Sequence, residues 1–339
     1  MRSLDWVDGA IEMVDQTQLP QATEILRIQT VPDLVAAIKR LSVRGAPAIG
    51  VAGAYGVAMA AVTHNPTAER AAFDEAVLSI REARPTAVNL AKMVDRVSPI
   101  AKVDPAAALA EAHLIRDEEL QASLDMGDRG ADLVVELLSD EITVPGERLI
   151  RAMTICNTGG LATVERGTAL AVIQTLHERE LLHEALPAET RPLLQGGRLT
   201  TWELQRMGAP HRLFVDSAAP FLLASGAADV VLIGADRVAA NGDTANKIGS
   251  FAMALGASNA AVPFIVVAPE STVDIDTPSG DHIKIEDRGA DEVGSVRGTP
   301  IAPEGTAAVN PAFDITPASL ITAIVTDKRV VRIDRGDQL

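Results

Sequence analysis

The pattern of apolar and polar residues predicts a mostly helical first part of the chain. Two short stretches with β-like alternation, at residues 10–14 and 23–29, precede helical periodicity that continues to about residue 120. Helices are predicted at residues 31–41, 45–63, 67–82, 86–97 and 105–138. The last helix is expected to break near Gly127 and Gly130, because glycine weakens a helix interior. A small, mostly helical domain with short β-strands is therefore expected over residues 1–125.

The pattern changes near residue 148, where apolar runs of strand length begin to alternate with helical segments. Strands are predicted at residues 149–156, 213–216, 229–233, 263–268 and 320–326. Helices are predicted at residues 162–180, 201–206, 218–224 and 244–259. This alternation is typical of a parallel sheet with helices on its faces. The sequence thus predicts an α/β protein whose second domain, residues 126–339, has a Rossmann-like parallel sheet.

Three polar residues come at the ends of predicted strands: Cys156, Asp216 and Asp236. In doubly wound sheets, ligands bind beyond the carboxyl ends of the strands, where all three residues are expected. Burial of Asp236 would favour its protonated form, which could act as a general acid near neutral pH. The alternative is structural, since Asp236 could equally bond its own loop or pair with Arg237. Asp243, further along this loop, is expected to cap a helix.

Cys156 is followed by Gly159, Gly160 and then a helical pattern. A strand, a glycine turn and a helix N-terminus together favour an anion, because free backbone N–H groups and the helix dipole attract negative charge. Taken alone this signal is weak, since a single cysteine at a strand end is more often a small core residue. Arginines that could hold phosphate precede predicted helices at Arg44 and Arg84, and again in the segment from Glu189 to Arg198.

Composition narrows the functional classes. The 339 residues carry a formal net charge of −16, which argues against a nucleic-acid partner, and 47% of them are hydrophobic, which allows a large core. One cysteine cannot form an internal disulfide, and acidic residues near the start argue against a signal peptide, so a cytoplasmic location is expected.

The uncharged run at residues 45–63 is rich in Ala and Gly and predicts a buried helix, without a membrane span. The spacing of His177 and His183 does not match a zinc motif, and no metal site is expected.

Taken together and in order, the motifs resemble the methylthioribose-1-phosphate isomerase family. This family belongs to a superfamily with ribose-1,5-bisphosphate isomerases and regulatory subunits of a translation-initiation exchange factor. The resembling segments are VRGAPAIGVAGAYGVAMA, RPTAVNL, TICNTGGLAT with GTALAVI, ETRPLLQGGRLTTWEL, GADRVAANGDTANKIG and NPAFDITPASLITAIVTD. The resemblance spans nearly the whole chain.

The resemblance implies a sugar-phosphate isomerase of methionine salvage in which Cys156 and Asp236 are the catalytic pair. It implies that the sugar phosphate is bound by Arg44, Gly45, Ala46, Arg84, Gln195, Asn246 and Lys247, with Gly159 and Gly160 as a possible phosphate turn. A homodimer without metal or nucleotide cofactor is also implied.

Two departures from the family pattern bear on the substrate. Residues 213–219 read LFVDSAA where the isomerase usually has threonine, aspartate, asparagine and methionine, and the Asp-Ser-Ala sequence resembles the ribose-bisphosphate branch. The strand expected before ETRP contains Pro187, which a central strand would resist. 5-Methylthioribose 1-phosphate remains the first substrate. The alternatives are ribose 1,5-bisphosphate, 5-deoxyribose 1-phosphate and, outside enzymes, a non-catalytic regulatory subunit.

Overall fold

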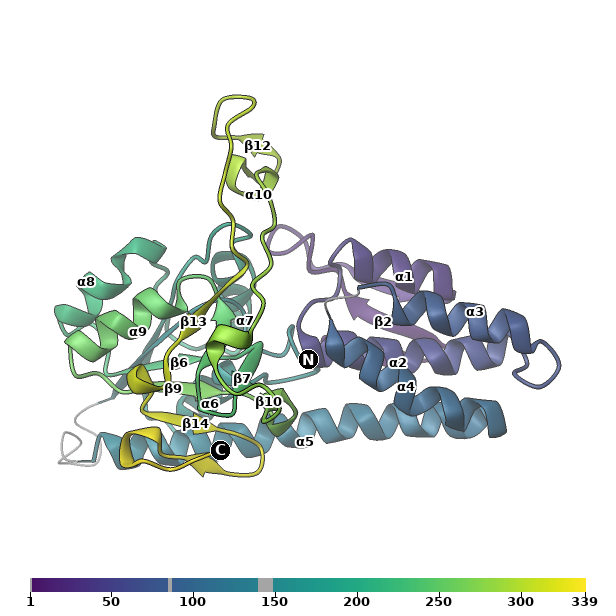
Figure 1. The fold of residues 1–339 in the computed structure, drawn as a ribbon, viewed down its shortest axis with the longest axis horizontal. Coiled ribbons are helices and arrows are strands. Elements are labelled where there is room, and N and C mark those ends of the chain that lie inside the picture. The colour runs from purple at the N-terminus through teal and green to yellow at the C-terminus, as the bar shows by residue number, and fades with distance from the viewer. Residues whose placement is uncertain (1, 85–86, 140–148) are drawn as a thin grey trace. The chain divides into compact units, whose positions relative to one another are not determined.

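The computed structural model describes residues 2–84, 87–139 and 149–339, and the chain forms two compact units (Figure 1). The first unit consists of Met1–Ala122 and Gly159–Gly167, and the second of Ser123–Thr158 and Thr168–Leu339. Pro85 and Thr86, where a helix was expected to begin, lie outside the described residues.

The first unit combines a small antiparallel sheet with helices. Its sheet has the order β1 (Leu4–Val7), β2 (Ala10–Val14) and β3 (Ile25–Ile28). Its helices are α1 (Val31–Lys39), α2 (Ala46–Thr63), α3 (Arg70–Arg81), α4 (Val88–Val103) and the first part of α5 (Pro105–Leu137). The predictions for β2, β3 and these helices are confirmed, although α4 continues past its predicted end at residue 97 to Val103, and β1 was not predicted.

Helix α2 forms the centre of the first unit. By length and composition it could cross a membrane, but 78% of it is buried inside the structure, as expected of a core helix. Its glycines allow the neighbouring helix α4 to approach closely. A Cβ added to Gly53 would lie 2.5 Å from Leu90 Cδ1, so the small residue is required for this packing. The interpretation of residues 45–63 as a buried helix is confirmed.

Helix α5 continues without a break past its two glycines, so the predicted interruption is wrong. Both glycines face α6 (Ala169–Glu178) in the second unit. A Cβ on Gly127 would lie 2.7 Å from Thr175 Oγ1, and a Cβ on Gly130 would lie 2.4 Å from Val172 Cγ2. These glycines therefore allow two helices to pack closely, which outweighs their low helix propensity.

A six-stranded sheet organises the second unit. Its order is β15 (Val330–Val331), β14 (Ala323–Val325), β9 (Phe264–Val267), β6 (Val230–Ile233), β4 (Ile150–Thr154) and β5 (Leu182–Pro187). All neighbouring strands are parallel except β15, which runs antiparallel to β14. Four predicted strands are confirmed as β4, β6, β9 and β14. Residues 213–216 do not form a strand, because only Phe214 makes an isolated bridge, to Ala188.

Strand β5 is the strand that the resemblance placed before ETRP, and the apolar pattern alone did not predict it. It lies at the edge of the sheet and ends at Pro187, where a missing N–H interrupts no central ladder. Predicted helix 162–180 begins only at Ala169, after an irregular loop. The predictions for α7 (Thr201–Arg206) and α8 (Ala219–Ala224) are confirmed.

A four-stranded sheet corrects the prediction of a helix over residues 244–259. Its order is β10 (Val273–Asp274), β7 (Arg237–Ala239), β8 (Thr244–Lys247) and β13 (Phe313–Thr316). Residues 244–247 are a strand because β8 pairs with both β7 and β13, and only α9 (Ser250–Asn259) is helical. Asp243 therefore does not cap a helix at residue 244, and its carboxylate accepts the N–H groups of Gly280 and Ala318.

Short elements complete the second unit. They are α10 (Asp291–Gly294) and the hairpin of β11 (Ser295–Val296) and β12 (Thr299–Pro300), which project from the rest of the unit in Figure 1. The expected α/β class is thus confirmed as a mixed α/β fold.

Candidate active site

Cys156 lies directly beyond β4 and is held by its backbone from two sides. Its N–H donates to Thr190 Oγ1 at 2.8 Å, and its carbonyl accepts from Thr200 Oγ1 at 2.6 Å. Its φ of 66° is in the left-handed region, which residues other than glycine rarely adopt. Such strained backbone persists only where the surroundings fix it, and it is concentrated at functional sites. The single thiol of the chain is half-buried at this position.

The loop after Cys156 does not begin a helix, so the predicted strand, turn and helix N-terminus is wrong. Residues Gly159–Gly167, called the inserted loop below, belong to the first unit. Helix α6 starts after this loop, and Thr158 lies beside its first turn because Thr158 Oγ1 accepts the N–H of Leu170 at 3.1 Å. Helix α6 therefore does not follow Gly159 and Gly160 directly, and the role of this pair as a phosphate turn stays a prediction.

Asp236 lies in the loop between β6 and β7, and its N–H donates to the carbonyl of Ala245 at 2.9 Å. Because β6 and β4 are neighbours in the sheet, the loops that follow them lie side by side. A Cβ on Gly234 would lie only 2.9 Å from Thr158 Cγ2, which shows how closely these loops pack. The Asp236 residue is exposed, so the buried position expected for it is wrong. The neighbouring Arg237 forms an ion pair with Asp274 at 3.4 Å.

Three predicted binding residues also lie in the second unit. Gln195 is 1% exposed and immediately precedes a short π-helix, Gly196–Thr200. Within the part of the chain that the structure describes, its Oε1 atom has no hydrogen-bond partner. A buried amide oxygen without a partner is costly, and a ligand donor would relieve that cost.

Asn246 and Lys247 are almost fully buried in β8. Asn246 Nδ2 donates to Ser250 Oγ at 2.8 Å. Lys247 Nζ donates to the carbonyl of Ala312 at 2.9 Å and lies 4.9 Å from the centre of the Phe313 ring. A buried ammonium group held in this way offers a fixed positive charge to an anionic ligand.

Asp314 on β13 lies directly across from Asn246, and sequence reasoning did not single it out. Its carboxylate accepts the N–H groups of Gly249 at 2.7 Å and Phe251 at 3.2 Å at the start of α9. Burial raises the pKa of Asp314 to about 6, although these two N–H groups and Lys247 oppose the shift. The pairing of β13 with β8 is a long-range contact, so no local pattern could have revealed it.

The remaining predicted binding residues, Arg44, Gly45, Ala46 and Arg84, lie in the first unit. Arg44 and Gly45 directly precede α2, as expected, whereas Arg84 follows α3. Gly45 has a φ of 88°, and a Cβ there would lie 2.0 Å from the carbonyl oxygen of Ala162 in the inserted loop. Glycine is thus required at this turn both by the positive φ and by the close approach of the Ala162 carbonyl oxygen. A common site of these four residues with Cys156 stays a prediction.

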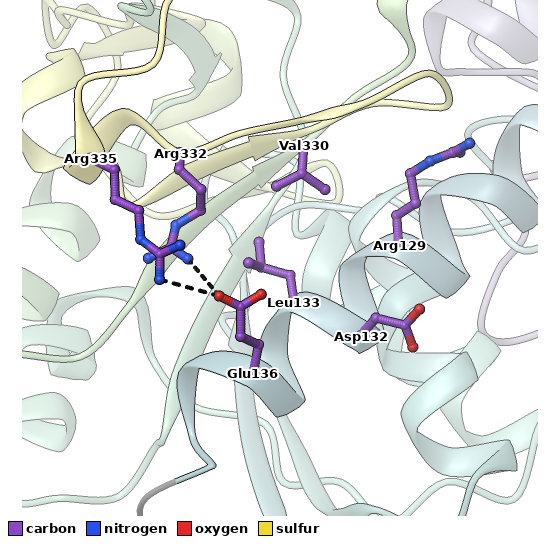
Figure 2. Close-up of a pocket in the computed structure, with 7 residues that line it drawn as sticks. All are labelled: Arg129, Asp132, Leu133, Glu136, Val330, Arg332 and Arg335. Carbon is purple, nitrogen blue, oxygen red and sulfur yellow. Dashed lines mark hydrogen bonds and ion pairs between the residues drawn. The ribbon is translucent and has the colours of Figure 1, made fainter.

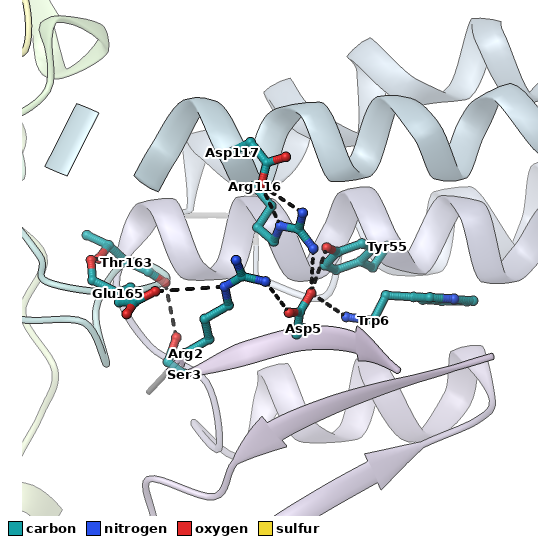
Figure 3. Close-up of polar contacts among 9 residues, drawn as sticks. All are labelled: Arg2, Ser3, Asp5, Trp6, Tyr55, Arg116, Asp117, Thr163 and Glu165. Carbon is teal, nitrogen blue, oxygen red and sulfur yellow. Dashed lines mark hydrogen bonds and ion pairs between the residues drawn. The ribbon is translucent and has the colours of Figure 1, made fainter. Parts of the chain in front are cut away.

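The inserted loop is held within the first unit by residues at the start of the chain (Figure 3). Ser3 Oγ donates to the carbonyl of Thr163 at 3.3 Å, and Arg2 Nε lies 3.8 Å from a carboxylate oxygen of Glu165. Arg2 also pairs with Asp5 of β1 at 2.5 Å. These contacts connect β1 to the loop that packs against Gly45, so the N-terminal strand supports the predicted phosphate turn.

A separate pocket of about 450 Å³ lies in the second unit between α5 and the C-terminal residues (Figure 2). It is lined by Arg129, Asp132, Leu133, Glu136, Val330, Arg332 and Arg335. Its arginines already have acceptors, since Arg332 and Arg335 each lie 3.2 Å from Glu136 Oε1. The pocket contains none of the predicted site residues and is not part of the candidate active site.

Comparison with known proteins places the chain in a family. Residues 42–332 match the initiation factor 2 subunit family, IF-2B. A probable bifunctional methylthioribose-1-phosphate isomerase/methylthioribulose-1-phosphate dehydratase of Nocardia farcinica is 50% identical over 97% of this chain, which spans only 59% of that protein. The methylthioribose-1-phosphate isomerase of Alkalilimnicola ehrlichii is 45% identical over 98% of this chain and 94% of its own length.

Among solved structures, the 5-methylthioribose 1-phosphate isomerase of Pyrococcus horikoshii superposes with a TM-score of 0.90. It is 36% identical, and the match covers 98% of this chain and 92% of that one. Sequence and structure thus agree over nearly the full length of the chain. The chain belongs to the initiation factor 2 subunit family, within its branch of methylthioribose-1-phosphate isomerases.

Proposed function

We propose that this chain is an aldose–ketose isomerase that converts 5-methylthioribose 1-phosphate into 5-methylthioribulose 1-phosphate. The observation that carries the proposal is the strained, doubly held Cys156 beside the Asp236 loop, in a chain 45% identical to a named isomerase. A regulatory subunit that acts only by binding partners would not need a thiol fixed in an unfavourable backbone conformation.

The first chemical step is ring opening. The anomeric oxygen of an aldose 1-phosphate carries the phosphate, so the sugar cannot open spontaneously to a free aldehyde. Asp236, in its protonated form, donates a proton to the ring oxygen while the bond from C1 to that oxygen breaks. Because Asp236 is exposed in the chain without substrate, the bound sugar must exclude the water that surrounds this carboxyl group.

The second step moves hydrogen from C2 to C1. In one route, the Cys156 thiolate removes the C2 proton and an enediol-like species forms. In the other route, hydride passes directly from C2 to C1, and Cys156 sets the electrostatics of the pocket. In the first route the proton on Cys156 is then given to C1. In both routes the C2 hydroxyl group loses its proton to the Asp236 carboxylate, so the C2 ketone forms and the acid is restored. Reaction in D₂O separates the routes, since solvent deuterium at C1 requires an exchangeable base.

We infer that the substrate is bound by the residues that the resemblance implies. In the second unit, Lys247 offers a buried positive charge, and Gln195 and Asn246 offer amides for the sugar hydroxyl groups. In the first unit, Arg44 and Arg84 contribute guanidinium groups for the phosphate. Gly45 and Ala46 add the N-terminal amides of α2. Gly159 and Gly160 contribute a further turn.

The substrate is tested directly with a panel of three sugar phosphates and purified protein. Ketose formation from 5-methylthioribose 1-phosphate, ribose 1,5-bisphosphate and 5-deoxyribose 1-phosphate is followed by NMR. The proposal predicts the highest kcat/KM for the methylthio sugar. Preference for the bisphosphate would instead assign the chain to the branch that its Asp216, Ser217 and Ala218 sequence resembles. No turnover of any of the three would favour a regulatory subunit.

The assembly follows from the same resemblance, whereas the location follows from the composition of the chain. We infer a cytoplasmic homodimer with domains at residues 1–125 and 126–339, without nucleic-acid or membrane partners and without a metal or nucleotide cofactor. Light scattering tests this proposal, because a dimer has twice the chain mass of 35.6 kDa in solution. A mass equal to that of one chain would contradict it.

A further inference from the structure

Asp216 follows the bridge between Phe214 and Ala188 and reaches the loop that holds Cys156. One carboxylate oxygen, Oδ1, accepts the N–H of Thr190 at 2.7 Å, and the other, Oδ2, accepts the N–H of Arg191 at 2.6 Å. Both oxygens therefore have a backbone donor. Charge-assisted bonds of this kind are about twice as strong as neutral ones.

The Thr190 hydroxyl links this carboxylate to Cys156. Because the Cys156 N–H can only donate, Thr190 Oγ1 must accept it, and the hydroxyl proton is then given to the carbonyl of Ala188 at 3.0 Å. Thr190 is fully buried and has a φ of 66°, which is unfavourable for a β-branched residue. The bonds from the N–H groups of Thr190 and Arg191 to Asp216 oppose a change of this backbone conformation.

Gly196 provides the space for this arrangement. A Cβ at this position would lie 1.7 Å from the carbonyl oxygen of Ala188 and 2.9 Å from Thr190 Oγ1. The contacts among Asp216, Thr190 and Cys156 thus form one connected network, in which the N–H groups of Thr190 and Cys156 and the Thr190 hydroxyl each have an acceptor. All of its members lie in the second unit.

We propose that Asp216 is a positioning residue for Cys156: its carboxylate fixes Thr190, and the Thr190 hydroxyl fixes the backbone amide that sets the direction of the thiol. Asp216 touches neither thiol nor substrate in this role. The inference deepens the proposed isomerase function, on which its effect on turnover rests. The positioning of Cys156 can be measured without any substrate.

The test replaces Asp216 with asparagine. Asn keeps the size of the side chain but has one acceptor oxygen, so its amide NH₂ must face the N–H of either Thr190 or Arg191. Turnover of 5-methylthioribose 1-phosphate should fall about 10- to 100-fold with KM within about twofold, because a small displacement of a catalytic group has effects of this size. Without substrate, iodoacetamide should alkylate Cys156 about fivefold faster, since the loop opens more often. Cys156 is the single cysteine, so the mass of the labelled protein reports it alone.

Two variants of Thr190 test the link itself. Thr190→Val removes the hydroxyl while keeping the shape, and it should reproduce the kcat loss and the faster alkylation of Asp216→Asn. Thr190→Ser retains a hydroxyl and should stay close to the wild-type protein in both measurements. Equal behaviour of the Val and Ser variants would overturn the proposal, because the hydroxyl would then have no role.

Asp243→Asn is the matched control. Asp243 also accepts two backbone N–H groups, of Gly280 at 3.0 Å and Ala318 at 2.9 Å, in the same unit. This variant should lower the thermal midpoint about as much as Asp216→Asn does, because each loses one backbone bond to a carboxylate. It should leave the alkylation rate of Cys156 unchanged. If both Asn variants accelerate alkylation equally, or if Asp216→Asn leaves it unchanged, Asp216 does not position Cys156. If alkylation responds as expected but wild-type protein forms no ketose, positioning holds and the isomerase proposal fails.

Discussion

At the scale of single residues, Asp314 combines burial with two backbone donors. Its carboxylate bonds the N–H groups of Gly249 and Phe251, yet burial dominates and raises its pKa to about 6. A carboxyl group whose pKa is raised by folding binds its proton more tightly in the native state. Its contribution to stability is therefore fully present below the unfolded pKa of 3.8 and is lost as the pH rises through about 6.

The first prediction follows from the direction of this pKa shift. Asp314→Asn removes the charge that the native state holds unfavourably above pH 6, while keeping an acceptor for α9. The thermal midpoint of the variant minus that of the wild-type protein should therefore become more positive between pH about 5 and about 8. Scanning calorimetry of both proteins at the two pH values measures it. A difference that is constant, or that becomes more negative at the higher pH, would contradict the assigned shift.

At the scale of elements, the contact of α5 with α6 depends on Gly130. Replacing this glycine with alanine should gain about 1 kcal/mol of helix propensity but lose about 1 to 3 kcal/mol through overpacking. The Cβ would lie 2.4 Å from Val172 Cγ2, so we expect Gly130→Ala to lower the unfolding free energy by about 1 kcal/mol.

Urea unfolding measures this change, and Val172→Ala serves as the matched partner. In the double variant the added methyl group meets a smaller side chain. The loss of unfolding free energy in the double variant should therefore be smaller than the sum of the losses in the two single variants. An increase in stability in Gly130→Ala would mean that the backbone of α5 can shift. Helix propensity would then determine the change in unfolding free energy at this position.

The same elements show what sequence alone can predict. Local periodicity correctly placed α1, α2 and the central strands of the large sheet, because each has its own hydrophobic pattern. It failed for β8, whose extended backbone is set by pairing with β7 and β13 from distant parts of the chain. It failed for Gly127 and Gly130 because glycine at a close helix contact and glycine at a helix break look alike in sequence.

At the scale of the whole molecule, the candidate residues divide between the two units. Cys156, Asp236 and Lys247 were identified from their motifs, and they lie in adjoining loops or strands of the second unit. The residues that hold Cys156 in place were harder to predict. Thr190 occurred in a segment noted for its arginines, and its bond to Cys156 crosses 34 positions, so only the fold brings the two together.

In the proposed mechanism, this chain isomerises 5-methylthioribose 1-phosphate with Asp236 as the acid. The most direct test compares the turnover of this sugar by wild-type protein and by Asp236→Asn, with thermal unfolding as the control for folding. We predict ketose formation by the wild-type protein and a turnover about 10²- to 10⁴-fold lower in the variant, with an unchanged unfolding midpoint. Equal turnover by the two proteins would contradict the assignment of Asp236, and absence of ketose from the wild-type protein would contradict the function itself.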